Sequence, residues 1–381
     1  DLEGACSLNG FLAGGRCVCD KGWTGSDCGA LKLGPTADNR VDAGRIYPPS
    51  ASKTSSWGGG VVQRDGKFHL YVSEMSQHCG LGTWNTNSFI RHAESDTVDG
   101  VFTPDSTPVL GVWAHNAMPW LTPDGDISIW HIGDGTPARR PEQTGCANGT
   151  TPVSATETHA DLAAPAPISR IPYSHSPNGP WKTMNVTCVS SAGAVGPCPI
   201  DNPTPVSLTN GTTLLAHRAR GGFGLLVAPH WSGPYRNIAS GMLNSTNINS
   251  PEDEFSCEDG FLFHGQRGGI HLLCHCNGVK GYPWDDHGRV AFSRDGITWR
   301  WSKERTFPPA LTHPDKTNTS HISRQRPQLV FGPGNVPTQL ITGVAAASTN
   351  RPYPWQAGCS ELDAVSKPCD LTYTAMQPIL P

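Results

Sequence analysis

The chain has 381 residues, of which 36% are hydrophobic and only 16% charged, so it is long enough to bury a large core. Its net charge is −4 without a basic run, which argues against nucleic acid and an anionic membrane surface as main partners. No apolar stretch approaches the ~20 residues of a membrane helix, so we expect no membrane span.

The first segment, residues 1–32, holds four cysteines among glycines and polar turn residues: Cys6, Cys17, Cys19 and Cys28. It has too few apolar side chains for a core, so we expect disulfides, which persist in an oxidising compartment. A four-cysteine zinc site is the alternative, which the C-x-C spacing and the lack of a C-x2-C pair disfavour. The spacing C-x-C-x8-C with an internal Gly-Trp-x-Gly resembles the second half of an epidermal-growth-factor-like (EGF-like) module. That resemblance implies the pairs Cys6–Cys17 and Cys19–Cys28.

The chain has 13 cysteines, an odd number, so at least one is a thiol or pairs with another chain. Close spacing predicts two loop staples, Cys188–Cys198 and Cys359–Cys369. The sequence leaves the pairing of the other five open: Cys79, Cys146, Cys257, Cys274 and Cys276.

Five Asn-x-Ser/Thr sequons agree with an extracellular, secreted or cell-surface location. We expect most of them to be glycosylated surface positions. They are Asn148, Asn185, Asn210, Asn244 and Asn318.

Beyond the first segment, one pattern recurs five times: an apolar stretch, a turn and an alternating strand. In the first two copies the turns are Asp65-Gly66 and Asp124-Gly125, which are strong hairpin signals between apolar runs. Five units of four strands predict an all-β fold, a five-bladed β-propeller over residues 33–381. A β-sandwich with long loops is the alternative. The copies begin near residues 56, 114, 201, 258 and 326.

Two stretches depart from this pattern. Residues 136–200 are rich in Thr, Ala, Pro and Ser, so we expect an insertion, either a glycosylated excursion or an ordered loop stapled by disulfides. The alternating tail, residues 371–376, is expected to close the ring by pairing with the first or the last blade.

The repeated hairpins resemble the five-bladed propellers of glycoside hydrolase families 43 and 32. The best local matches are residues 84–102 and the Ser-x-Asp-Gly-x-x-Trp segment Ser293–Trp299. Both are structural signatures, so they indicate the fold and not the chemistry.

Glycoside hydrolysis normally requires two carboxyl groups that flank the scissile bond. In the families resembled, acidic residues open the inner strands of blades one, two and three. Here those positions fall on Gly58 with its neighbours, on Asn116 and on Asp201, so the implied machinery is incomplete. A hydrolase would use Asp201 as its acid with a relocated base. The candidates for that base are His115, Glu258 and Asp259.

Several other side chains are candidates for ligand binding. The indole rings of Trp57 and Trp113 are candidate sugar platforms, although packing between blades is the alternative. Arg91 and Arg326 are candidates to orient an acidic group on a glycan, although structural ion pairs are the alternative.

His271 and His275 share one face of a predicted strand, which could direct them at the propeller axis. A structural ion on that axis is the one cofactor considered, and hydrogen-bonded core histidines are the alternative. Cys274 and Cys276 point to the opposite face and are not predicted to ligate a metal.

These features predict a secreted, glycosylated and disulfide-bonded protein. We expect it to bind carbohydrate or to build extracellular structure on a degenerate glycoside-hydrolase-like propeller. Its expected partners are carbohydrate, copies of itself or other extracellular proteins. An active glycosidase acting on an extracellular polysaccharide is the alternative.

Overall fold

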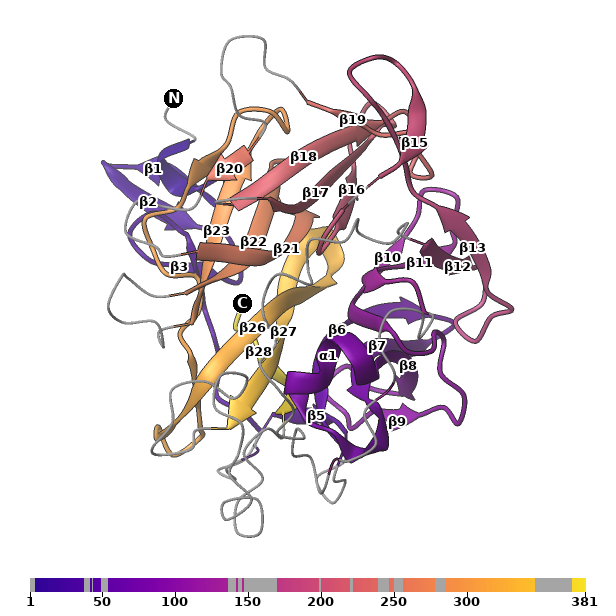
Figure 1. The fold of residues 1–381 in the computed structure, drawn as a ribbon. Helices are drawn as coiled ribbons and strands as arrows, with labels where there is room; N and C mark the ends of the chain where they lie inside the picture. The colour runs from indigo at the N-terminus through magenta and orange to yellow at the C-terminus, as the bar shows by residue number, and fades with distance from the viewer. Residues whose placement is uncertain are drawn as a thin grey trace.

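The computed structural model describes five antiparallel sheets arranged as a propeller, with a small module on one side (Figure 1). The predicted all-β, five-bladed propeller is therefore confirmed. The described residues are 4–37, 42, 44–48, 54–135, 142, 146, 170–198, 200–219, 222–238, 247–249, 256–277, 286–346 and 372–381.

Blades 1 to 4 are meanders in which the first strand lies nearest the axis. Blade 1 contains β6 (Ser56–Arg64), β7 (Lys67–Met75), β8 (Ser88–Ser95) and β9 (Thr103–Pro104). Blade 2 contains β10 (Ala114–Leu121), β11 (Ile127–Gly133), β12 (Arg170–Ser174) and β13 (Lys182–Asn185). Blade 3 contains β16 (Thr204–Ser207), β17 (Thr213–Ala219), β18 (Gly222–Ala228), β19 (Arg236–Asn237) and β20 (Asn247–Asn249). Blade 4 contains β21 (Ser256–His264), β22 (Ile270–Asn277), β23 (His287–Ser293) and β24 (Arg300–Trp301).

Blade 5 joins the two ends of the propeller. Its strands run in the order β25 (Ala310–Thr312), β26 (Asn318–Gly332), β27 (Val336–Ala346), β28 (Thr372–Pro378) and β5 (Arg45–Tyr47). The expected pairing of the tail with the last blade is confirmed, because β28 pairs along the whole of its length with β27. The sequence did not reveal that β5, which precedes blade 1 in the chain, forms the outer edge of this sheet.

Short elements and one extra hairpin connect these sheets. Turns such as Asp65-Gly66 have positive φ at both residues, as the short hairpin loops require. The helical segments are η1 (Gly4–Cys6), η2 (Ser76–His78), η3 (Leu81–Thr83), α1 (Trp84–Asn87) and η5 (Pro333–Asn335), and the hairpin is β14 (Thr187–Val189) with β15 (Val195–Pro197).

Apolar side chains fill the spaces between neighbouring blades. Between blades 3 and 4, for example, Leu214 and Phe223 pack with Leu262 and Leu272, and all four are buried. Burial of one such side chain stabilises the fold by about 1.5–3 kcal/mol, so the contacts between blades dominate its stability.

The outer strands of blade 2 lie inside the stretch 136–200 that was expected to be an insertion. β12 and β13 pair with each other, and β12 pairs with β11. Three of the four residues of β13 are exposed, so this strand lacks the apolar alternation that identifies a half-buried strand. Residues 136–141, 143–145 and 147–169 lie outside the described residues.

Five disulfides join described cysteines. They are Cys6–Cys17, Cys19–Cys28, Cys79–Cys146, Cys188–Cys198 and Cys257–Cys276. Cys274 keeps its thiol and is buried, whereas Cys359 and Cys369 lie outside the described residues.

Three of the five predicted glycosylation sites lie among the described residues. Asn185, Asn210 and Asn318 are exposed, and Asn148 and Asn244 lie outside the described residues.

The N-terminal module packs firmly against the propeller. It contains β1 (Gly10–Ala13), β2 (Arg16–Cys19), β3 (Trp23–Thr24) and β4 (Ala30–Leu31). The Trp23 ring is stacked on Phe263 of blade 4, with centroids 6.4 Å apart. The Asp27 carboxylate accepts hydrogen bonds from the Lys303 backbone N–H at 2.6 Å and from the Ser302 hydroxyl at 3.2 Å. The module and the propeller therefore share one core.

We expect Trp23→Ala to destabilise the whole chain, because it opens a cavity in this shared core. The free energy of unfolding should fall by about 3–5 kcal/mol, as for other buried tryptophans, in chemical denaturation followed by circular dichroism. Phe11→Ala in the same module is the matched control, because that ring is 47% exposed. A Trp23→Ala variant that unfolds in two separate transitions, with an unchanged propeller, would contradict the shared core.

Candidate functional site

One residue from each blade adopts a left-handed backbone conformation on the innermost strand or directly before it. Four of these residues sit in a β-bulge, where the strand register shifts by a residue. Bulges redirect side chains, here toward the axis. The residues, called the axial ring, are Gly58, Asn116, Asn202, Asp259 and Arg326, with φ of 57°, 65°, 48°, 61° and 56°.

Hydrogen bonds connect four of the five members of the axial ring. The Asn116 amide donates to Asn202 Oδ1 at 2.8 Å, and the Asn202 amide donates to Asp259 Oδ1 at 2.8 Å. The Arg326 guanidinium donates to Asp259 Oδ1 at 2.7 Å and to the Asn116 carbonyl at 2.8 Å. Burial by itself would raise the pKa of Asp259, but the charge of Arg326 lowers it well below the ordinary value. Asp259 is therefore an ionised carboxylate that is committed to the ring.

The fifth member, Gly58, has no room for a side chain. A Cβ added there would lie 2.6 Å from Cβ of Arg326, and the positive φ would strain it further. The aliphatic part of the Arg326 side chain occupies the space beside Gly58. This explains why blade 1 has no acidic residue at that position.

Asp201 and Glu258 carry two further carboxyl groups. They directly precede Asn202 and Asp259 of the axial ring in the chain. Arg218 Nε contacts Glu258 at 2.8 Å, and Arg218 Nη1 lies 3.7 Å from Asp201 Oδ2. About half of the Asp201 side chain and a fifth of the Glu258 side chain are exposed. Burial raises the pKa of both groups, and the negative charge of Asp259 raises that of Glu258 further. One guanidinium therefore bridges two carboxyl groups whose pKa values burial raises.

His275 on β22 interacts with two of these carboxyl groups and with a fourth, that of Asp286, through its charge. Its Nδ1 lies 3.3 Å from Asp259, and its Nε2 lies 3.7 Å from Glu258. Burial alone would lower the pKa of His275, but the hydrogen bond to Asp259 and the charges of Asp259, Asp286 and Glu258 raise it overall.

Asp286 itself is buried, and it accepts hydrogen bonds from Ser323 at 2.9 Å and Gln325 at 2.8 Å. Burial raises the pKa of Asp286 as well, and four acidic side chains thus interact with three basic ones. The acids are Asp201, Glu258, Asp259 and Asp286, and the cations are Arg218, Arg326 and His275.

His115 lies beside Asn116 but does not fit the role of a relocated base. Burial, together with the charge of Arg326, lowers its pKa to about 3. Its Nδ1 lies 2.7 Å from the Ser88 hydroxyl, and its ring is 5.5 Å from that of Trp84. His115 is therefore a neutral and very weak base at physiological pH.

Trp113 lies close to this group, with its ring 6.3 Å from that of Trp84. It is half-buried, and its indole N–H has no hydrogen-bond partner among the described residues. Trp113 and Trp84 are thus half-buried neighbours, and Trp84 also packs against the core cluster that contains Trp57 and Met75.

Three of the proposed binding residues have structural surroundings instead. Trp57 is 3% exposed and packs with Met75. Arg91 forms an ion pair with Glu74 at 3.0 Å. His271 is buried against the EGF-like module, where its Nε2 lies 3.0 Å from the Ser7 carbonyl, so it does not reach the axis.

Sequence reasoning missed Asn202, Arg218 and Asp286. Asn202 had a usable signal, because it follows Asp201 as Asp259 follows Glu258, directly before or inside an inner strand. Arg218 and Asp286 lie at strand ends whose local pattern does not distinguish them from solvent-exposed charges.

Comparison with known proteins agrees with both parts of this architecture. The family model for the Teneurin-like EGF domain matches residues 2–30. No curated protein matches the chain.

Solved structures share the propeller fold at low sequence identity. A family 117 glycoside hydrolase from the marine bacterium Zobellia galactanivorans is 13% identical, with a TM-score of 0.52 over 91% of this chain and 90% of that one. A putative glycoside hydrolase from Bacteroides ovatus is 11% identical, with a TM-score of 0.57 over 91% of this chain and 96% of that one.

The chain is thus an EGF-like module joined to a five-bladed propeller with the fold of glycoside hydrolases. The module and the disulfides are typical of extracellular proteins. No helix in the described part of the chain is long and apolar enough to cross a membrane.

The raised pKa of His275 leads to a prediction about pH. Its ordinary value is 6.5, so its ion pair with Asp259 contributes stability that is complete below that pH and is lost as the pH rises through the folded-state pKa. We expect the Tm of the wild-type protein to fall over this window, and that of His275→Asn to change less. Differential scanning fluorimetry between pH 5.5 and 9 measures both. Equal slopes for the two proteins would show that His275 is not protonated in the folded state.

Proposed function

We propose that this protein is a secreted glycoprotein whose axial site binds carbohydrate without cleaving it. The observation that supports this most directly is that each carboxylate of the site is already engaged. Asp259 is held by Arg326 and Asn202, and Arg218 lies against both Asp201 and Glu258. No described acid faces them from the blade-one position, because Gly58 stands there.

Arg218, Asp201 and Glu258 contact one another but are also partly exposed, and their chemistry suits sugar hydroxyls. The Arg218 guanidinium donates hydrogen bonds, and the carboxyl groups of Asp201 and Glu258 accept or donate them according to their protonation. Adjacent hydroxyls of a pyranose present the same alternation of donors and acceptors. A small number of fixed polar groups of this kind is what orients a ligand in a small-molecule site.

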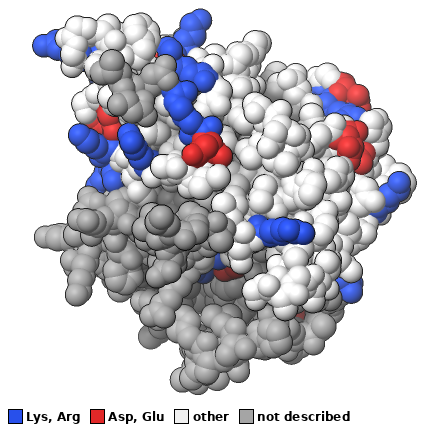
Figure 2. Space-filling model, turned by 90° about the horizontal axis from the view of Figure 1, so that it is seen from above, with Lys and Arg blue, Asp and Glu red and all other residues white. Residues whose placement is uncertain are grey.

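The surface agrees with a ligand of low charge. On the face seen in Figure 2, most of the described surface is neither basic nor acidic, and the charged side chains lie in small groups. Secretion is supported by the five disulfides and by the three exposed sequons. Assembly with copies of itself or with other extracellular proteins stays a prediction, and light scattering under reducing and non-reducing conditions measures it.

Arg218→Ala tests the binding site. We expect the affinity for the oligosaccharides that the wild-type protein binds on a glycan array to fall about 10- to 100-fold, because hydrogen bonds to charged groups contribute about 1.5–3 kcal/mol. Arg300→Ala, at an exposed arginine on β24, is the matched control and should leave binding unchanged. Unchanged binding by Arg218→Ala would overturn the assignment of this site.

The raised pKa values of Asp201 and Glu258 favour an active glycosidase as the second candidate function, because one protonated carboxyl group is what a general acid needs. In that case the wild-type protein releases reducing ends from the glycans it binds, and Asp201→Asn abolishes the release while leaving the circular dichroism spectrum intact. We expect no release from the wild-type protein in this assay. Release that Asp201→Asn removes would replace the binding proposal with the enzymatic one.

A further inference from the structure

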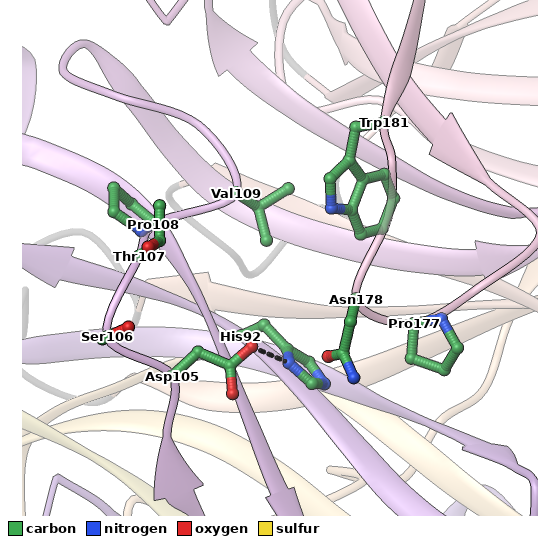
Figure 3. A pocket seen from close by; sticks show the side chains of 9 residues that line it. All are labelled: His92, Asp105, Ser106, Thr107, Pro108, Val109, Pro177, Asn178 and Trp181. Carbon is green, nitrogen blue, oxygen red and sulfur yellow. Dashed lines mark hydrogen bonds and ion pairs between the residues drawn. The ribbon is translucent and has the colours of Figure 1, made fainter.

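A pocket of about 340 Å³ opens between blades 1 and 2, on outer elements rather than on the innermost strands (Figure 3). Three segments line it: His92 on β8, residues 105–109 after β9, and residues between β12 and β13. Trp181 and Val109 lie at one end of the pocket, whereas Asp105, His92 and Asn178 lie at the other. It shares no lining residue with the axial site.

Tyr71 holds the two sides of this pocket in place. Its hydroxyl donates a hydrogen bond to the Pro177 carbonyl at 2.9 Å, and its ring meets Trp181 edge-on at 5.8 Å. The same ring lies 5.0 Å from that of His92. Since Tyr71 is fully buried, it fixes the wall of blade 2 to the wall of blade 1.

The polar end of the pocket is built on a chain of hydrogen bonds. Asp105 Oδ2 lies 2.7 Å from His92 Nδ1, and His92 Nε2 lies 2.9 Å from His69 Nδ1. His69 Nε2 is 3.3 Å from the Arg64 carbonyl, which accepts hydrogen bonds and cannot donate them. The His92 ring is thus held between Asp105 and His69, which fixes its orientation.

The His92 ring supports Asp105 from the buried side of the pocket. Burial, and then the charge of His92, lower the pKa of His69, which keeps the second ring neutral. The His92 side chain is 1% exposed and that of Asp105 is 41% exposed. The buried His92 ring therefore orients one carboxylate oxygen and leaves the rest of the carboxyl group open to the pocket.

The backbone of the pocket wall is also fixed from behind. Arg91 Nη1 donates to the carbonyl oxygens of Asp105 and Ser106, both at 3.0 Å, while Nη2 is paired with Glu74. Arg91 is thus a support for the wall and is not directed at a ligand in the pocket.

We propose that this pocket is a second carbohydrate site that takes one neutral sugar residue of a glycan. The Trp181 indole and Val109 offer an apolar wall for the C–H face of the ring. Asp105 offers a preoriented acceptor for one or two hydroxyls, and Asn178 adds both a donor and an acceptor. The volume and the mixture of one aromatic wall with a few fixed polar groups are typical of small-ligand sites.

The charges of the pocket distinguish neutral from acidic sugars. Asp105 is the only ionisable side chain besides His92 among the nine lining residues, and none of the nine is a lysine or an arginine. A uronate or a sulfated sugar would place its negative charge near Asp105 without a cation to balance it. The site is therefore expected to reject acidic glycans.

The test uses full-length protein on an array of neutral and acidic oligosaccharides, with Asp105→Asn and Trp181→Ala as the variants. We expect each variant to lose at least 10-fold in affinity for a subset of the neutral glycans, while Arg218→Ala keeps that subset. Asp99→Asn, at an exposed aspartate of blade 1, is the matched control. Trp181→Phe is a second, milder variant that keeps an aromatic ring against Tyr71. It allows the test to be made even if Trp181→Ala does not fold.

The outcomes separate the two sites. Neutral-glycan binding that survives both Asp105→Asn and Trp181→Phe unchanged, but is lost in Arg218→Ala, overturns the second site and keeps the axial one. Loss in Asp105→Asn together with retention in Arg218→Ala supports the second site independently of the proposed function. Wild-type protein that binds no neutral glycan overturns both proposals.

Discussion

The buried ion pair between Arg326 and Asp259 is the constraint on which the centre of the propeller depends. Both side chains are almost fully buried, and removing two charges from water costs several kcal/mol for each ion unless further hydrogen bonds satisfy them. Asn202 and the Asn116 carbonyl supply those bonds. The ion pair between blades 4 and 5 is thus stable only when blades 2 and 3 present Asn116 and Asn202 beside it, so it couples the geometry of four blades.

The same ion pair explains why the site differs from that of a two-carboxylate hydrolase. Arg326 occupies the space beside Gly58, which leaves no room for an acid in blade one, and it holds Asp259 in the ring. Asp201 and Glu258 remain outside the ring but share Arg218. This arrangement is the basis of the proposal that the site binds a ligand through fixed hydrogen bonds and does not carry out the proton transfer that cleavage requires.

Much of the fold was predictable, because hairpin signals are local. Asp65-Gly66 forms a two-residue turn with positive φ at both positions, whereas Asp124-Gly125 lies in a longer loop between Leu121 and Ile127 in which only Gly125 has positive φ. The axial site was less predictable, because its contacts join residues far apart in the chain: Arg326 and Asn116 are 210 positions apart.

Alternation correctly placed His271 and His275 on one face of β22, but it could not show what each faces. His271 meets Ser7 of the module, 264 positions away, whereas His275 meets Asp259. Period-two patterns give the side of a strand and contain no information about which segment covers it. The sequence pattern did not reveal β13 at all. An exposed outer strand has no buried face and therefore shows no clear alternation of apolar and polar residues.

The closure of the ring by β5 and β28 has a consequence for synthesis on the ribosome. The EGF-like module and β5 are synthesised before Phe263 and Ser302, against which the module packs and which follow more than 200 residues later. The partner of β5 follows later still, because β28 spans Thr372–Pro378. The disulfides of the module join cysteines 11 and 9 residues apart, so both can form before those partners are synthesised. The propeller, in contrast, keeps an open seam with unpaired backbone groups until β28 has been synthesised, and such an edge favours pairing with other chains.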